Sequence, residues 1–412
     1  MYDVVIVGSR VAGAATALLL ARRGHRVLCV DRASFPSDTV STHMITVEGC
    51  AQLRRWGLLD KIDATGCPAI TNIDLDLDFP RYGHFVLSGF PNTVDDGFAA
   101  IYAPKRTILD KLLVDEARAA GAEVRENFTV QEILREDGTV TGIRGVTQSG
   151  TNVVERARIV VGADGMNSLV ARTVEAPEYH TAPPLAFGYY CYWADVPLNG
   201  LEFYTRPGGT VIAFPTHDNH SAIFVERPSD QFKDFKKDLL GSYTRSIETY
   251  APRLAERFRG GTQCHRIVGA GNRRNFFRKP GGPGWALVGD AGVHKDPITA
   301  QGITDAFRDA ELLADAIGSW QSGTHDQQDA LESYEQARND ALKPLYDFIV
   351  DHAAMEPFED VFQDVLAALR DDPEALSEFF GVIQNTVPWG NFFTPQNLSR
   401  LLDSQPEFQN AG

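Results

Sequence analysis

The stretch Gly284–Leu313, GWALVGDAGVHKDPITAQGITDAFRDAELL, decides how this chain is organised. A short apolar run ends at Asp290, and Pro297 prevents an early helix start. From Gly302 onward, apolar side chains recur at helical spacing. The stretch therefore predicts a strand, a sharp turn, an irregular loop and a helix that begins near Gly302. A carboxylate beside the positive end of a helix dipole suits an anionic cofactor, although an ordinary strand–turn–helix gives the same pattern.

A second motif of this kind stands at the N-terminus. Residues Asp3–Val7 form an apolar run typical of a strand buried on both faces, and GSRVAG follows at positions 8–13. After a helix-forming run, a second buried strand, His25–Val30, ends at Asp31. Glycines that allow a tight turn, a helix start and an acid about 20 residues further on are the βαβ fingerprint of dinucleotide binding. A purely structural α/β turn remains the alternative.

Two arginines modify this fingerprint. Arg10 stands where the middle glycine usually lets the backbone approach the phosphates, so we expect its side chain either to swing away or to add positive charge near a phosphate. Asp31 repels a 2′-phosphate, because two unit charges ~4 Å apart near a surface interact by about 4 kcal/mol. FAD or NAD is therefore favoured over NADP, and Arg32 beside Asp31 opposes that preference.

Composition limits the class of protein. The 412 residues allow two or three domains, and the net charge of −16, with a pI near 5.1, argues against nucleic acid and anionic membrane surfaces as partners. Five cysteines without C-x-x-C spacing predict neither a disulfide framework nor a metal site. No signal peptide is visible, and no apolar run reaches the ~18 residues needed to cross a bilayer. We therefore expect a cytoplasmic protein.

The rest of the chain mixes strands and helices. Strict alternation in Ile70–Asp78, with aspartates at every second position, predicts a half-exposed strand. The segment 183–226 is rich in β-formers and aromatics, which favours a sheet core and a substrate cavity. Further elements are expected as strands at 83–87, 129–135, 139–146 and 157–161, and as helices at 47–56, 105–120, 232–259 with a break at Pro252, 327–352, 359–369, and short helices opening at Pro373 and Pro395.

A third motif completes a recognisable set. GADGMNS at 162–168 lies between the N-terminal fingerprint and LVGDAGVHKDP at 287–297. With these motifs in this order, the chain resembles the FAD-dependent monooxygenases of the p-hydroxybenzoate hydroxylase type over roughly residues 1–340. That superfamily also contains geranylgeranyl reductases and flavin halogenases. The resemblance implies an α/β (α+β) flavoprotein in which a Rossmann-like FAD-binding domain is interleaved with a β-sheet substrate domain, followed by C-terminal helices.

The resemblance also implies domain boundaries and cofactor contacts. The FAD-binding parts would be residues 1–68, 101–180 and 263–335, the substrate domain 69–100 and 181–262, and the C-terminal helical region 336–412. Asp31 would hold the ADP half, Asp290 the ribityl chain, and the loop 297–302 would lie against the flavin ring, where the helix start stabilises negative charge. The expected FAD contacts are Gly8, Arg10, Gly13, Asp31, Arg32, Arg106, Val130, Asp164, Gly165, Gly289, Asp290, Pro297, Gln301, Gly302 and Ile303. Arg172 comes one residue later than in the commonest pattern.

The segment TVIAFP at 210–215 separates the chemistries of the superfamily. Halogenases carry W-x-W-x-I-P there, and neither tryptophan is present. Isoprenoid reductases carry an aromatic-x-W-x-F-P stretch, of which only Phe214-Pro215 matches. A non-catalytic binding protein of the same fold is a third alternative, and the intact acids Asp164 and Asp290 speak against it.

A monooxygenase is therefore the predicted function, with double-bond reduction as the alternative. NAD(P)H would reduce the flavin, O₂ would add at its C4a carbon, and the hydroperoxide would hydroxylate or epoxidise an apolar or aromatic small molecule, as in secondary metabolism and natural-product tailoring. Candidate catalytic residues are His43, His217 and His294 as acid–base groups, and Pro297 beside the flavin; a single histidine is more often structural. The sequence does not predict the oligomeric state or the substrate's identity.

Overall fold

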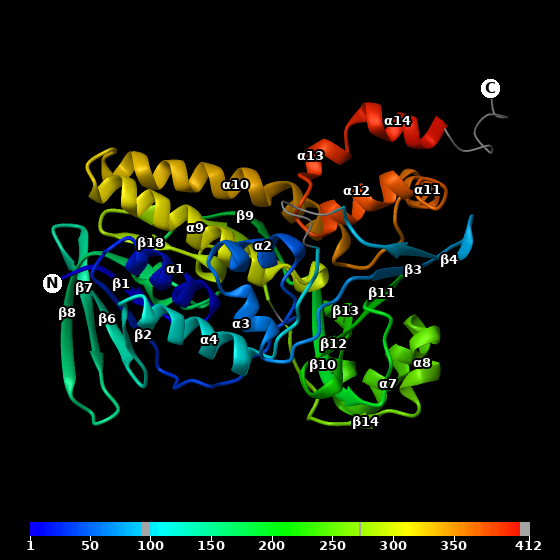
Figure 1. The fold of residues 1–412 in the computed structure, drawn as a ribbon, viewed down its shortest axis with the longest axis horizontal. Coiled ribbons are helices and arrows are strands. Elements are labelled where there is room, and N and C mark those ends of the chain that lie inside the picture. Colours follow the sequence, from blue (N-terminus) through cyan, green and yellow to red (C-terminus); the bar gives the residue numbers. More distant parts are fainter. Residues whose placement is uncertain (93–98, 272, 404–412) are drawn as a thin grey trace.

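The structure is a computed structural model that describes residues 1–92, 99–271 and 273–403. The predicted domain ranges 69–100, 263–335 and 336–412 extend over positions 93–98, 272 and 404–412, which lie outside the described residues. Figure 1 shows an elongated molecule with the N-terminal sheet at one end, a second sheet beside it, and the C-terminal helices above the second sheet.

The first sheet is built around parallel strands, of which β2 and β18 are fully buried. Their spatial order is β18-β8-β1-β2-β5, and β17 pairs with β18 at the edge. The register places Val4 of β1 opposite Val27 of β2 and Ile159 of β8. The strands are β1 (Tyr2–Val7), β2 (Val27–Val30), β5 (Glu123–Arg125), β8 (Asn152–Gly162), β17 (Gly281–Gly282) and β18 (Trp285–Leu287). The predicted α/β fold class is confirmed, with the parallel strands carrying the three glycine-rich motifs at their carboxyl ends.

The predicted hairpin is present as β6 (Thr129–Glu136) and β7 (Thr139–Val146). The chain then differs from the expected meander followed by a separate strand, because β8 is one long strand. Its first half pairs antiparallel with β7 and its second half pairs parallel with β1. One strand thus links the exposed hairpin to the buried sheet.

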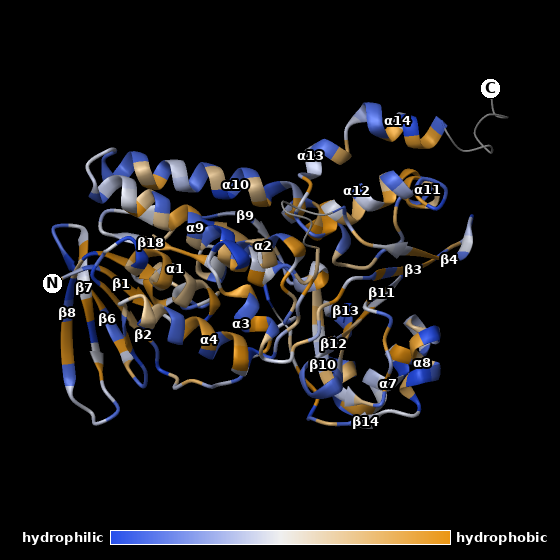
Figure 2. Ribbon diagram, viewed as in Figure 1, coloured by the Kyte–Doolittle hydropathy of each residue, from blue (hydrophilic) through white to orange (hydrophobic). Residues whose placement is uncertain are grey.

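The helices on this side bury apolar side chains in one core shared with the parallel strands (Figure 2). Helix α1 packs against α4 and α9, and α10 packs along α9. Helix α9 begins at Gly302, as the sequence predicted. The helices on this side are α1 (Val11–Arg22), α2 (Val47–Arg55), α3 (Leu59–Asp63), α4 (Arg106–Ala119), α9 (Gly302–Gln321) and α10 (Gln327–His352).

The second sheet is mainly antiparallel, with the order β14-β10-β13-β12-β11-β3-β4 and β15 paired to β10. It joins the two segments assigned to the substrate domain, since β11 pairs parallel with β3. Its strands are β3 (Ile73–Phe79), β4 (Gly83–Gly89), β10 (Ala186–Ala194), β11 (Leu201–Arg206), β12 (Gly209–Thr216), β13 (His220–Pro228), β14 (Thr262–Gln263) and β15 (Val268–Ala270). Helices α6 (Phe232–Phe235), α7 (Leu239–Tyr250) and α8 (Pro252–Phe258) cover one face, with the expected break at Pro252.

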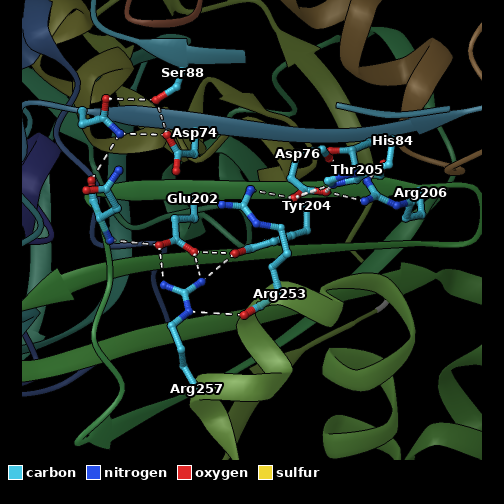
Figure 3. Close-up of polar contacts among 12 residues, drawn as sticks. Asp74, Asp76, His84, Ser88, Glu202, Tyr204, Thr205, Arg206, Arg253 and Arg257 are labelled. Carbon is cyan, nitrogen blue, oxygen red and sulfur yellow. Dashed lines mark hydrogen bonds and ion pairs between the residues drawn. The ribbon is translucent and has the colours of Figure 1, made fainter. Parts of the chain in front are cut away.

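The prediction that the 70–78 strand is half-exposed is wrong. Asp76 of β3 is only 1% exposed, and Asp74 is buried too. Figure 3 shows the reason: Arg206 of β11 and Arg253 of α8 both pair with the Asp76 carboxylate, and Ser88 donates to Asp74. Alternation correctly marked the two faces of the strand, but cations from distant segments allow Asp76 to be buried on the polar face, where Asp78 stays exposed.

The C-terminal region folds into short helices against the second sheet (Figure 1). Both predicted proline starts are confirmed; before Pro373, the Asp372 side chain caps the helix by accepting from the Ala375 N–H at 3.0 Å. The helices are α11 (Asp360–Ala368), α12 (Pro373–Ile383), α13 (Trp389–Phe392) and α14 (Pro395–Asp403). Their apolar faces share a core with β3, β11 and β12.

A third, three-stranded sheet was not predicted. It consists of β9 (Glu178–Ala182), β16 (Asn275–Arg278) and β19 (Val293–His294), in the order β19-β16-β9. Such short strands carry too few residues to show a period of two. Within the described residues, none of the helices combines the length and apolar composition that crossing a membrane requires.

Candidate active site

A polar cavity of about 870 Å³ runs along the carboxyl ends of the parallel strands. The three glycine-rich motifs meet there, together with the residues around the start of α9. The sequence-predicted cofactor residues that line it are Gly8, Arg10, Asp31, Arg32, Arg106, Val130, Asp164, Gly165, Gly289, Asp290, Pro297, Gln301, Gly302 and Ile303. Segments nearly 300 residues apart in sequence thus form one site.

Gly13 acts behind the cavity wall. A Cβ atom on Gly13 would stand 1.8 Å from the Gly8 carbonyl oxygen, and one on Gly8 would stand 2.4 Å from the Ala163 oxygen. Glycine at both positions lets the first fingerprint turn pack directly against the third motif. This close approach is the packing role that glycines have in dinucleotide-binding turns.

Asp31 is held at the end of β2 by two backbone groups. Its carboxylate accepts from the Ser9 N–H at 2.7 Å and from the Ala33 N–H at 2.8 Å. The acid is therefore fixed beside the fingerprint turn before any ligand binds. Its position at the cavity suits acceptance of a ribose hydroxyl.

The Arg10 side chain forms an ion pair with the fully buried Asp110 at 2.7 Å, and it donates to Ser37 Oγ at 3.0 Å. Arg106, at the start of α4, pairs with the other Asp110 oxygen at 2.9 Å. We expected the Arg10 side chain either to swing away from the phosphate position or to add positive charge there. The ion pair with Asp110 corresponds to the first expectation. The charge of Arg10 still lies in the cavity wall.

Asp164 brings a buried carboxylate to the cavity. One oxygen accepts from the Leu169 N–H at 2.6 Å, whereas Oδ1 has no hydrogen-bond partner among the described residues. Burial raises the pKa of Asp164. Asp290 differs, because it stands exposed on the turn after β18. Gly289 supplies the positive φ of that turn.

The loop between Asp290 and α9 carries a compact set of charges. Lys295 pairs with Asp305 in the first turn of α9, and Arg308 reaches the same carboxylate at 2.8 Å. Burial lowers the pKa of Lys295 to about 7. His294 stacks on Phe276, and burial lowers its pKa as well.

Unsatisfied polar atoms mark where a ligand would complete the site. Considering only the part of the chain that the structure describes, Asp164 Oδ1, Thr299 Oγ1 and Gln301 Oε1 are buried without a hydrogen-bond partner. All three residues line the cavity. Buried polar groups in proteins are normally hydrogen-bonded, so these atoms fit a ligand with hydroxyl and amide donors along its length. FAD has that chemistry, and the glycine turns and Asp31 fit its ADP half.

A second, apolar cavity of about 230 Å³ adjoins the first. Its walls come from β3, β11, the end of α10 and the helices α11 and α12. Thr299 and Gln301 line both cavities. Gln301 also donates to the Ile383 carbonyl of α12 at 2.7 Å, which ties the start of α9 to the C-terminal wall. An apolar molecule here would lie beside the Pro297 end of the polar cavity.

The candidate histidines separate into two groups. His294 lines the polar cavity, as does Pro297. Neither His43 nor His217 is among the described residues that line the cavities. His43 is fully buried, contacts Tyr192 Oη through Nε2 at 2.5 Å, and has its pKa lowered to about 3 by burial. His217 forms a hydrogen bond with Thr65 Oγ1 at 2.8 Å. This contact joins the end of β12 in the second sheet to the segment after α3, so the role of His217 is structural.

Several residues on the cavity were not singled out from the sequence. They are Asp296, Asp305 and Asp309, all acidic and all close to the predicted helix start. A signal was available, because Asp305 and Asp309 interrupt the apolar positions that follow Gly302. The aromatic wall contributed by the C-terminal helices carried no comparable signal, since helix cores use the same residues.

Comparison with known proteins agrees with this geometry. A family model described as "FAD binding domain" matches residues 1–349. The digeranylgeranylglycerophospholipid reductase of Methanocella arvoryzae is 27% identical over 353 residues, which are 83% of this chain and 83% of the relative. The structure of the flavin-dependent brominase Bmp2 superposes with a TM-score of 0.81 at 18% identity, covering 99% of each chain. That of pqsL, "a probable FAD-dependent monooxygenase from Pseudomonas aeruginosa", gives 0.70 at 22% identity, covering 93% of this chain and all of that one.

Proposed function

We propose that this chain, which belongs to the FAD-binding-domain family and is an FAD-dependent oxidoreductase, is a monooxygenase acting on an apolar small organic molecule. The observation that carries the proposal is the junction of the two cavities. An apolar cavity meets the polar cavity at Thr299 and Gln301, on the loop that leads into α9. A substrate without charges would therefore be held against the reacting end of the cofactor.

The residues divide the work of binding. Asp31 would accept from the adenosine ribose, and the Gly8 turn would receive the pyrophosphate at the start of α1. Asp290 stands where it could accept from the ribityl hydroxyls. The start of α9 at Gly302 would place its unpaired N–H groups against the flavin ring and stabilise negative charge there. Bound FAD, reduced by NAD(P)H, would supply the electrons and the activation of O₂.

Exclusion of water is the task of the apolar cavity. Its lining includes Phe203, Phe362, Phe379 and Phe380. Removing water from a reactive site prevents side reactions and strengthens electrostatic interactions within it. A substrate that fills this space would protect the oxygen-transferring step from solvent.

Reduction of a double bond is the second candidate. It is favoured by the 27% identity to the archaeal reductase over most of both chains. The segment 210–215 opposes it, because Thr210 of β12, which lines the apolar cavity, stands where the reductase pattern has an aromatic residue. Both reactions would use the same FAD site, so the fold does not separate them.

Oxygen consumption tests the proposal. The FAD-loaded protein should oxidise NAD(P)H slowly by itself and release hydrogen peroxide. Addition of an apolar or aromatic molecule that fits the second cavity should accelerate NAD(P)H oxidation and lower the yield of peroxide. NAD(P)H oxidation that proceeds at the same rate under nitrogen, with a double-bond substrate present, would instead establish the reductase.

A further inference from the structure

The proposed monooxygenation needs a proton donor, and none of the three candidate histidines is suited to that role. His43 is a neutral, fully buried group held by Tyr192, and His217 is held between Thr65 and the Lys105 backbone. His294 reaches the cavity, but its Nδ1 is bonded to the Arg274 carbonyl at 2.8 Å, and burial lowers its pKa. A proton donor should therefore be sought among groups whose protonated form is favoured.

Two buried carboxyl groups lie near the loop at Pro297, both against strand β10. Asp296 and Glu226 are each 1% exposed. Asp296 accepts from the Ala186 N–H of β10 at 3.1 Å. Glu226 of β13 lies opposite Gly188 of β10, with its Oε1 3.5 Å from where a Gly188 Cβ would stand. Ala186 and Gly188 are two residues apart, so the Asp296 carboxyl, bonded to the Ala186 N–H, and the Glu226 carboxyl, packed against Gly188, both lie at the start of β10.

Each carboxyl group has one unsatisfied oxygen. Counting partners within the described residues, neither Asp296 Oδ1 nor Glu226 Oε2 has a hydrogen bond. Two ionised carboxylates buried together would repel strongly, whereas one proton between them removes the repulsion. Burial raises the pKa of Glu226 well above its usual value, and the Asp296 charge raises it further. Burial also raises the pKa of Asp296 to about 6.

Other charges near the pair come from its own loop and from the segment before β16. Arg273 lies close enough to lower the pKa of Asp296. His294 and Lys295 precede Asp296 in the loop, and Lys295 is already paired with Asp305. Of the two carboxyls, Asp296 lines the polar cavity and Glu226 stands behind it.

We propose that Asp296 and Glu226 form a carboxyl pair that holds one proton and delivers it, through Asp296, to the ligand in the polar cavity beside Pro297. Glu226 is the store and Asp296 is the donor; solvent returns the proton after each cycle. This inference rests on the proposed function, because it assigns the acid for that reaction. Oxygen transfer from O₂ with NAD(P)H takes up one proton from outside the reductant for each water released, and the pair supplies it.

The first arm of the test needs no activity. The Tm of wild type, Glu226→Gln and Asp296→Asn is measured from pH 5 to pH 9, with the exposed Glu248→Gln as a matched control. In the native wild type the pair keeps a proton that a glutamate of the unfolded chain releases near pH 4.3. Wild type therefore loses stability as pH rises. Its folding equilibrium constant falls about tenfold per pH unit until the pH reaches the pKa of the pair in the native state. Glu226→Gln should therefore gain stability relative to wild type with rising pH. A Tm difference that stays constant from pH 5 to pH 9 would overturn the pair.

The second arm follows proton delivery. Dithionite-reduced, FAD-loaded protein is mixed with O₂ and hydrogen peroxide release is followed against pH. Two electrons and one proton come from the reduced cofactor, and the second proton comes from the pair. Asp296→Asn should slow release about tenfold or more at neutral pH, since general acids contribute ~10²–10⁴-fold. Glu226→Gln should move the fall in rate to lower pH, and Glu248→Gln should match wild type.

The two proposals fail differently. If the variants and wild type release hydrogen peroxide with the same pH dependence, Asp296 is not the proton donor, and the proposal of a monooxygenase still stands. A product without oxygen from O₂ would remove the monooxygenase, yet the peroxide assay would still decide whether the pair delivers protons. Reduced protein that does not react with O₂ would overturn both.

Discussion

The two cavities differ in how they are built. The polar cavity is assembled from short motifs, each with its own turn and helix start, and its residues face a ligand whose chemistry is fixed. The apolar cavity is assembled mainly from β3, β11, the end of α10 and the C-terminal helices, and the stretch 284–313 contributes only Ile298, Thr299 and Gln301 to it. A site for a common cofactor therefore leaves a local pattern in the sequence, whereas a site for a particular substrate depends on tertiary packing of ordinary core residues.

The largest effect that would sharpen this contrast is expected at Gly13. Gly13→Ala places a Cβ 1.8 Å from the Gly8 carbonyl oxygen, so the fingerprint turn must shift. Overpacking costs ~1–3 kcal/mol or more, and the displaced turn should abolish FAD retention. Absorbance of the purified protein near the flavin bands reports retention. Gly390→Ala, with open space at the Cβ position among the described atoms, should stay yellow; retained FAD in Gly13→Ala would contradict the packing role.

A second prediction concerns His43, which lies before α2 and contacts Tyr192 of β10 in the second sheet. Its pKa is lowered to about 3, so the native state binds fewer protons than the unfolded chain below pH 6.5. Stability contributed by neutral His43 is therefore present above pH 6.5 and is lost as pH falls toward 3, by roughly 1.4 kcal/mol per pH unit.

Urea unfolding at pH 7, 6 and 5 measures this loss. His43→Asn, which tolerates the positive φ of 62° at this position, should lose less stability on acidification than wild type. His325→Asn, at an exposed site, should follow wild type. If the free energy of unfolding falls equally with pH for wild type and His43→Asn, His43 is not a buried neutral group.

A third prediction separates the cavities by crossing two variants. Phe362→Ala removes an aromatic wall of the apolar cavity and should raise KM for an apolar substrate about tenfold, since burial of such a side chain is worth ~1.5–3 kcal/mol, while FAD affinity stays unchanged. Asp290→Ala should do the reverse, weakening FAD about tenfold or more because a charged acceptor contributes ~1.5–3 kcal/mol. Titration of apo-protein with FAD and steady-state kinetics read the two effects. If both variants weaken FAD binding equally, the two cavities do not separate cofactor binding from substrate binding.

The smallest effect is expected at Arg10. Its guanidinium is partly exposed and already paired with Asp110, so Arg10→Ala should weaken FAD binding by less than Asp290→Ala, and high salt should reduce the difference from wild type. Arg10→Gly is the matched variant, because it restores the usual glycine. Binding by Arg10→Gly as tight as wild type would show that the arginine is tolerated and does not assist the phosphates.

The sequence predicted what short-range patterns determine. The β1–α1–β2 unit, the hairpin, the start of α9 and the proline-initiated helices are confirmed, because each follows from spacing or turn residues within some 30 positions. The resemblance drawn from three motifs is confirmed by the family model. The burial of Asp76 was missed because its partners, Arg206 and Arg253, come from segments more than 100 residues away.

The same limit applies to the site. Apart from Gly13, the residues expected to contact the cofactor line the polar cavity. The placement of both Asp296 and Glu226 against β10 depends instead on the β10–β13 register and on a loop 70 positions further along the chain. The apolar wall depends on how α11 and α12 dock onto β3, which no periodicity encodes. Short strands such as β19 were missed for a simpler reason, since two residues carry no pattern.

We propose above all that oxygen from O₂ reaches an apolar molecule held against the start of α9. The most direct measurement is mass analysis of the product formed by the FAD-loaded protein with NAD(P)H under ¹⁸O₂, using apolar and aromatic molecules that accelerate NAD(P)H oxidation. We expect a product that carries one ¹⁸O atom and does not form without oxygen. A product that forms equally well under nitrogen, without the label and two hydrogens heavier than its substrate, would exclude the monooxygenase and establish the reductase.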